Sequence, residues 1–493
     1  MSNGLKKLAG ESVIYGVTTI LGRLLNYLLT PLYTWIITKN ELGNIASFYG
    51  VVAILLVLFT YGLETGFFRF SRDNENIYKT TLIMLIVTSC FLIVSTIIGA
   101  DSISNLFYEG KYKNTIIMLG IIVALDAFIS IPFANLRLQN RAFRFGIIKF
   151  VNIGINLSFN LIFLLFIPYL IKNEIISKDF VDFYNKGNAV FYIVLSNLIA
   201  SVSVYIFFIS DFKNLKGKFE KNLAIRILKY SWPVLVVGLT GMFIQNIDTQ
   251  LIPRLIKEDG FVQMAFYGAA FKIAVLMSLF TQSFRFAFEP YFFKSRDKGK
   301  EAYAKIMEYF VFFGIMIFLG ITVFIDIIYI IIKSGAGYHE AKELVPYILL
   351  GLLFFGIYYN LSLWYKLTDK TIWGSYFGII GMIITVLLNF ILIPKIGIMG
   401  SALALLTGYF IMMILSYLKG QKEYYVPYNL KRIGLFFIVG GVIYFLDCLV
   451  SFDFKIYSFI FKAVIFVSYI LFFIWMERND YIGSVVKKFL KIR

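Results

Sequence analysis

The sequence is poor in charged residues, cysteine and histidine. Only 15% of its 493 residues are charged, whereas a soluble domain has about 25%. Its two cysteines, Cys90 and Cys448, both lie in apolar stretches, and its single histidine, His339, lies in a polar connection. This supply excludes a disulfide framework and a cysteine-based metal site. We therefore expect no metal and no cofactor.

Apolar residues, by contrast, make up 59% of the chain and aromatic residues 18%. A membrane-spanning helix needs about 20 consecutive apolar residues, and fourteen segments meet this requirement. They are residues 12–37, 44–66, 80–100, 114–134, 147–167, 189–209, 230–253, 265–288, 304–331, 344–364, 372–393, 398–417, 433–450 and 457–476. The first is too long for the core of a signal peptide and lacks a convincing cleavage site. We predict an all-α polytopic membrane protein with about 14 transmembrane helices.

The chain is basic, with a formal net charge of +18. In a soluble protein this charge would suggest nucleic acid, but here the basic residues lie in short connections beside apolar spans. They are concentrated on alternate connections, which the positive-inside rule assigns to the cytoplasm. We therefore expect both termini to be cytoplasmic and no nucleic-acid partner.

Two pairs of passages indicate an internal repeat. Phe48–Gly50 opens one apolar segment and Phe266–Gly268 opens another with the same letters, and Phe145–Ile148 corresponds in the same way to Phe377–Ile380. Many transporters contain two such repeats and place one site at the interface between them.

The repeat predicts two six-helix lobes plus two C-terminal helices. The expected N-terminal lobe is 1–210, and a basic cytoplasmic linker, 211–229, joins it to a second lobe at 230–420. Residues 421–493 add the last two spans and a basic cytoplasmic tail.

Several short motifs, weak singly, occur in an order and spacing typical of one superfamily. They are Gly62-Leu63-Glu64-Thr65-Gly66, Asp248 with Leu251-Ile252-Pro253, Phe266 to Pro290, Tyr338 to Pro346, Thr368 to Thr371, Asn389 to Pro394, Gly397 to Ala402, and Thr407-Gly408-Tyr409. Over residues 5–420 the chain resembles the multidrug/oligosaccharidyl-lipid/polysaccharide (MOP) exporter superfamily. Within it, the chain is similar to bacterial polysaccharide flippases of the O-antigen type.

The resemblance implies a flippase in the bacterial cytoplasmic (inner) membrane. Its substrate would be a polyprenyl-diphosphate-linked oligosaccharide repeat unit, moved by alternating access from the cytoplasmic to the outer leaflet. The product would serve surface polysaccharide synthesis, lipopolysaccharide included. The resemblance also implies a monomer and a polysaccharide polymerase as a partner.

A diphosphate requires cations in its binding cavity, because a buried anion without partners is prohibitively unstable. Arg23, near the middle of the first span, and Lys272, two turns into the eighth, come from opposite lobes and are our main candidates. Arg285 is a third candidate, although it could instead snorkel to the cytoplasmic interface. Lys462 is better explained by snorkelling or by packing of the last two spans.

Acidic residues within spans allow two interpretations. Asp126 and Asp248 are candidates for ion coupling or for charge pairing with a neighbouring cation. Glu64, Arg69 and Glu289 are candidates for a cytoplasmic gate, although ion pairs, of Glu64 with Arg69 and of Glu289 with Lys294, are the simpler expectation. The remaining acids are expected to be interfacial (Asp326 and Asp447) or to stabilise a helix N-terminus (Glu308).

Two other functions stay open. A multidrug or organic-cation antiporter of the same fold should have acids dominating its cavity, whereas Arg23 and Lys272 indicate an anion. A membrane polysaccharide polymerase or glycosyltransferase usually needs a sizeable outer loop, and the longest here, about 168–188, is short.

Overall fold

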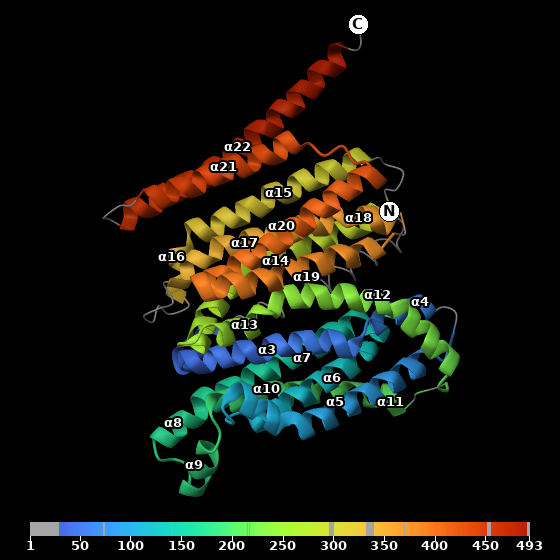
Figure 1. Cartoon of the computed structure of the whole chain (residues 1–493), viewed down its shortest axis with the longest axis vertical. Coiled ribbons are helices and arrows are strands. Elements are labelled where there is room, and N and C mark those ends of the chain that lie inside the picture. Colours follow the sequence, from blue (N-terminus) through green and yellow to red (C-terminus); the bar gives the residue numbers. More distant parts are fainter. Residues whose placement is uncertain are drawn as a thin grey trace. The chain divides into compact units, whose positions relative to one another are not determined.

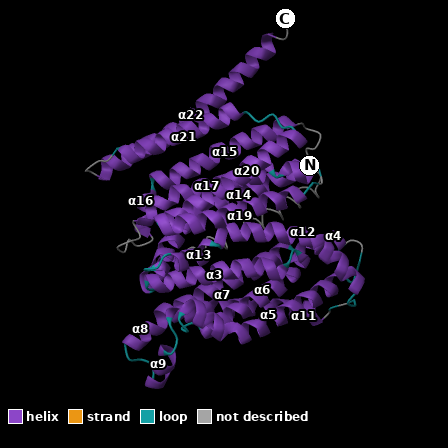
Figure 2. Ribbon diagram, in the orientation of Figure 1, coloured by secondary structure: helices purple, strands orange, loops and turns teal. Residues whose placement is uncertain are grey.

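The computed structural model describes residues 29–71, 74–139, 141–213, 215, 217–294, 300–331, 340–368, 370–450 and 455–490. All regular structure in these ranges is helical, without a β-strand (Figure 2). In these ranges, thirteen helical segments, several of them made of two or three consecutive helices, are long and apolar enough to cross a membrane. The all-α polytopic prediction is confirmed. The first predicted span, 12–37, lies mostly outside the described residues, and only its end is present, as α2 (Leu29–Ile36).

The chain divides into two compact units, the first of which comprises Met1–Gly268 and Ile372–Ala404. Besides α2, this unit contains α3 (Lys39–Thr60), α4 (Leu63–Phe70), α5 (Ile77–Tyr108), α6 (Lys113–Leu138), α7 (Ala142–Leu161), η1 (Ile162–Phe166), α8 (Ile167–Lys172), α9 (Lys178–Asn185), α10 (Ala189–Val204), η2 (Tyr205–Phe208), α11 (Ile209–Lys213), α12 (Lys221–Asn246), α13 (Asp248–Leu255) and α19 (Ile372–Ile396). It also includes the beginnings of α14 (Gly260–Lys294) and α20 (Ile398–Glu423).

Within the first unit, α6 is the central helix. In the most apolar stretch of α6, 67% of the residues are buried, whereas in that of α5 only 22% are buried. Phe91 and Ile98 on α5 are exposed by 66% and 76%. Apolar side chains this exposed on a spanning helix match a lipid-facing surface, because lipid tails solvate them as well as a protein core does.

One backbone break shapes this unit. The helix of the second predicted span is interrupted between α3 and α4, where Tyr61 and Gly62 have φ of 31° and 69°. A Cβ on Gly62 would lie 2.9 Å from the carbonyl oxygen of Ser231 in α12, so this close approach requires glycine. The seventh predicted span is divided into α12 and α13 at Ile247, whose backbone keeps helical angles (φ −64°, ψ −31°).

The second unit comprises Ala269–Thr371 and Leu405–Arg493. It contains the remainder of α14 and α20 together with α15 (Lys300–Val323), α16 (Ile325–Ile331), η3 (Glu340–Leu344), α17 (Val345–Leu361), α18 (Leu363–Leu367), α21 (Leu430–Leu449) and α22 (Lys455–Leu490). The last two helices lie beside α15 (Figure 1). Phe312 of α15 stacks on Phe473 of α22 at a centroid distance of 3.7 Å. The predicted appended pair therefore shares an aromatic core with α15.

These units differ from the predicted lobes in where α12, α13 and α19 belong, because α12 and α13 pack on α3 and α19 packs on α12 and α13. The boundaries at 210 and 230 remain a prediction.

Candidate functional site

Of the three predicted cations of the substrate cavity, Lys272 and Arg285 belong to the residues that the structure describes. Arg23 lies outside the described residues, so its pairing with Lys272 stays a prediction. Lys272 is half-buried on α14, inside the candidate membrane span Gly260–Arg285. Charged side chains within a span are costly and usually functional, which keeps Lys272 a candidate ligand for an anion.

Arg285 belongs to a group of cations around one tyrosine. Its guanidinium lies 5.1 Å from the centre of the Tyr359 ring. Lys366 lies 4.4 Å from the centre of the same ring and donates a hydrogen bond of 3.2 Å to the Tyr359 hydroxyl. Cation–π contacts of this kind hold basic side chains in place. Two basic side chains therefore meet at Tyr359, and Lys366 is one that was not predicted from the sequence.

Asp126 lies among polar groups inside the first unit. It is half-buried on α6, and Ser201 of α10 lies close to its carboxylate. The ammonium of Lys149, on α7, is close enough to attract the carboxylate, and it also lies 4.3 Å from the centre of the Phe133 ring. Lys149 is a neighbouring cation of the kind that the charge-pairing alternative requires, and both alternatives for Asp126 stay predictions. Lys149 stands inside the predicted span 147–167, so its position in the sequence could have revealed it.

Glu64 pairs with a different residue from the expected one. Its carboxylate lies 2.5 Å from the guanidinium of Arg137 on α6, whereas the side chain of Arg69 is exposed. Arg69 is five residues away on the helical α4, so it does not share a face with Glu64, whereas α4 and α6 are in contact. Glu64 therefore forms an ion pair, but the prediction that its partner is Arg69 is wrong. The side chain of Glu289 lies outside the described part of the chain.

Asp248 is deeply buried, with 3% exposure. It begins α13, directly after Ile247, and its carboxylate accepts a hydrogen bond of 2.8 Å from the amide of Thr249. Tyr267 lies close to the same carboxylate. The coupling and charge-pairing alternatives for Asp248 both stay predictions.

Two ion clusters join α15 and α16 to the C-terminal pair. At one end, Arg432 bridges Glu308 (3.3 Å) and Glu477, and Lys305 contacts Glu477 at 3.2 Å. Glu308 thus pairs with a buried arginine from another helix rather than acting only on its own helix terminus.

At the other end of the same helices, Lys462 lies 2.9 Å from Asp326 and 3.9 Å from Asp447. Lys342 contacts Asp326 at 2.5 Å. The packing interpretation of Lys462 matches this geometry. Within the described parts of the chain, each cluster pairs two positive with two negative groups, so their charges balance.

Comparisons with known proteins agree with this architecture. Residues 8–296 match the family model described as polysaccharide biosynthesis protein. No curated protein matches the chain. Among solved structures, the lipid II flippase MurJ in an inward closed conformation is similar over 95% of this chain and 100% of its own, with a TM-score of 0.74 and 17% identity.

A multidrug resistance MATE family transporter of the MOP superfamily is also similar, in two conformations. The similarity to the inward-facing form covers 84% of this chain and 95% of that structure's chain, with a TM-score of 0.64 and 14% identity. The similarity to the outward-facing form covers 88% of this chain and 99% of that structure's chain, with a TM-score of 0.54 and 14% identity. At these identities the likeness shows the fold alone, and that fold is the predicted two-lobe membrane architecture. Because the family model matches more than half of the residues, the chain belongs to the polysaccharide biosynthesis protein family, built on the fold of the MOP exporter superfamily.

Proposed function

We propose that this protein is a flippase for a polyprenyl-diphosphate-linked oligosaccharide, which it moves from the cytoplasmic to the outer leaflet by alternating access. The observation that carries the proposal is the placement of cations along α14. Lys272 lies inside a membrane span and Arg285 lies at its end, against Tyr359. A basic residue at the centre of a membrane helix is unfavourable by about 2.5–3.5 kcal/mol on insertion scales, so its retention there favours an anionic ligand.

The family and fold support the same substrate class. The family description is polysaccharide biosynthesis, and one solved neighbour is a flippase of lipid II. The finer assignments belong to the proposal: an O-antigen or other surface-polysaccharide unit as the glycan, the bacterial inner membrane as the location, cytoplasmic termini, a monomeric state and a polymerase partner. We place the protein among transporters rather than polymerases or glycosyltransferases.

The test is translocation in vesicles that contain the purified protein and a fluorescent polyprenyl-diphosphate oligosaccharide. Lys272→Met should slow movement to the outer leaflet by at least tenfold, because the diphosphate loses a cation inside the membrane. Lys272→Arg should keep a measurable part of the rate. As a control, Lys186→Met changes a lysine in the connection after α9 and should leave the rate within twofold. Failure of the native protein to move the lipid would refute the proposal.

The second candidate is an organic-cation antiporter, which the likeness to a multidrug resistance transporter favours. Its cation would bind Asp126 or Asp248, but Lys149 lies near the first, and the second is buried and accepts a hydrogen bond from the Thr249 amide. The same vesicles distinguish the two functions. Export of a lipophilic cation, with no movement of the lipid, would establish the antiporter.

A further inference from the structure

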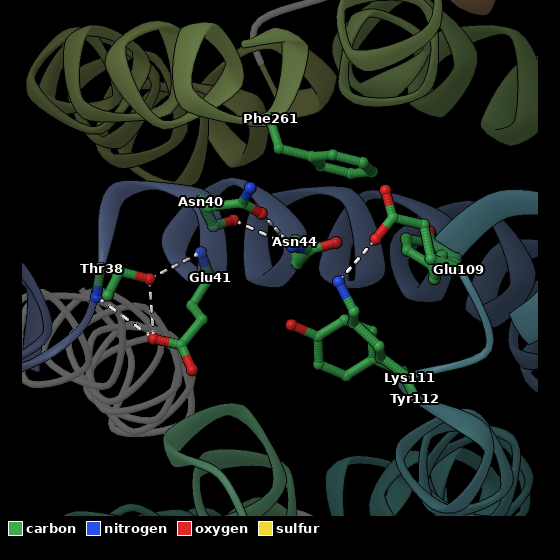
Figure 3. A pocket seen from close by; sticks show the side chains of 9 residues that line it. Thr38, Asn40, Glu41, Asn44, Glu109, Lys111, Tyr112 and Phe261 are labelled. Atoms are coloured by element: carbon green, nitrogen blue, oxygen red, sulfur yellow. Dashed lines mark hydrogen bonds and ion pairs between the residues drawn. The ribbon is translucent and has the colours of Figure 1, made fainter.

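The first unit contains a polar cavity at the end of its helices that the positive-inside pattern assigns to the outer face. Its volume is about 230 Å³. It is lined by the connection into α3, by the connection between α5 and α6, and by the start of α14 (Figure 3). The lining residues are Thr38, Asn40, Glu41, Asn44, Tyr108, Glu109, Lys111, Tyr112 and Phe261.

The backbone around this cavity is held firmly. Thr38 and Glu41 form a capping box at the start of α3, in which the Glu41 amide donates to the Thr38 hydroxyl at 3.3 Å. The backbone of Phe261 lies so close to Gly43 that a Cβ on Gly43 would lie 1.7 Å from the carbonyl oxygen of Phe261. The amide of Tyr112 donates to the hydroxyl of Ser104 at 3.1 Å. Three separate segments of the chain are thus fixed around one space.

The groups that face the cavity include both hydrogen-bond donors and hydrogen-bond acceptors. Asn44, 4% exposed, donates through its amide nitrogen to the backbone and side-chain oxygens of Asn40, at 3.0 and 2.9 Å. Its own side-chain oxygen is turned the other way, toward Lys111 and Glu109 (Figure 3). Burial, with the nearby carboxylates of Glu41 and Glu109, raises the pKa of Tyr112 to about 12, so its hydroxyl keeps its proton and can donate.

Charge narrows the ligand class. Two carboxylates, Glu41 and Glu109, line the cavity with one ammonium, that of Lys111, which lies 2.6 Å from Glu109. The Lys111 ammonium also lowers the pKa of Glu109, which keeps that carboxylate ionised. A site with net negative charge repels a diphosphate. The cavity therefore suits a neutral or amino-bearing ligand.

Shape narrows it further. The ring of Phe261 lies along one side of the space, opposite Tyr112 (Figure 3). Amides, carboxylates and hydroxyls beside an aromatic ring are the combination that binds a sugar, whose hydroxyls exchange hydrogen bonds and whose C–H face packs on the ring. The volume is below the ~300–1,000 Å³ of a pocket for a drug-sized ligand. It accommodates one sugar ring rather than a whole oligosaccharide.

We propose that this outer cavity is a glycan subsite that binds one neutral or amino-bearing sugar of the transported unit, with Phe261 as the stacking surface and Asn44 and Tyr112 as hydrogen-bonding groups. The inference rests on the proposed function and assigns the head group a contact separate from the cations that would hold the diphosphate.

The test uses the full-length protein in nanodiscs and no lipid substrate. The probe is the oligosaccharide released by mild acid from the polyprenyl-linked lipids of the cells in which the protein occurs naturally. Saturation-transfer NMR should show binding to the native protein, with a Kd at least fivefold higher for Phe261→Leu and within twofold for Phe261→Tyr, which keeps the ring. Asn44→Leu should weaken binding similarly, and the control Asn173→Leu, in the connection after α8, should not. Inorganic pyrophosphate should not compete.

The outcomes separate this inference from the proposed function. An oligosaccharide that does not bind, a Phe261→Leu variant that binds as the native protein does, or competition by pyrophosphate would overturn the subsite. Lipid translocation measured on the same samples decides the flippase independently. Binding that depends on the ring would support the subsite even in a protein that moves no lipid.

Discussion

At the scale of single residues, the attraction between Asp126 and Lys149 makes a quantitative prediction. Asp126→Asn removes the carboxylate that attracts the Lys149 ammonium most strongly. Unpairing a fully buried charge costs about 3–5 kcal/mol, and we expect ~2 kcal/mol here because both side chains are half-buried. Unfolding in mixed micelles with increasing SDS measures the change.

The double variant Asp126→Asn with Lys149→Met provides the control, since it removes both charges together. It should recover at least half of the lost stability, because neither charge remains buried alone. Equal stability of Asp126→Asn and the native protein would show that the pair is not formed. Translocation by the double variant that responds to proton and sodium gradients as translocation by the native protein does would exclude ion coupling through Asp126.

Residue positions were easier to predict than residue partners. That Asp126 and Glu64 stand near or within spans follows from the apolar runs around them. That Glu64 meets Arg137 does not, because the two are far apart in the chain and are brought together only by the packing of α4 on α6. Hydropathy places a charge along a helix, whereas its partner depends on helix rotation and tertiary contacts.

At the scale of elements, Arg432 should determine how firmly α21 and α22 are held on α15. It is 8% exposed and bridges Glu308 and Glu477. Among the residues that the structure describes, Arg432→Met would leave these two acids with Lys305, a more exposed cation, as their basic partner. We expect a protease in detergent solution to cleave the connection 424–429 about tenfold faster. Lowering the free energy of detaching α21 and α22 by ~1.4 kcal/mol makes the detached, cleavable state about tenfold more populated.

The comparison variant is Lys305→Met, which removes a cation that is 39% exposed and should change the cleavage rate by less than twofold. Similar cleavage of both variants would mean that the aromatic contacts of Phe312 hold the pair without help from the ions. The helices themselves were predictable because lipid offers no hydrogen-bond partner to the backbone. The break at Tyr61 and Gly62 was not, because it depends on the close approach of Gly62 to Ser231 of α12.

At the scale of the whole molecule, the proposed reaction moves charge across the membrane. Carrying two negative charges outward from a negative interior releases about 2.3 kcal/mol per charge per 100 mV. At ~60 mV the two charges together gain ~2.8 kcal/mol, which is about a hundredfold shift in the leaflet distribution at equilibrium. Vesicles with a potassium gradient and valinomycin can impose this potential in either direction.

We therefore expect the lipid to accumulate in the leaflet that faces the positive side of the membrane. Reversing the potential should invert the ratio of the lipid between the two leaflets. This directionality requires only a charged substrate and a protein with two access states, so Lys272→Arg should slow the approach to equilibrium without changing its end point. A distribution that ignores the potential would show that cations accompany the diphosphate. In that case the acids within the spans, Asp126 and Asp248, would be the side chains to test as their carriers.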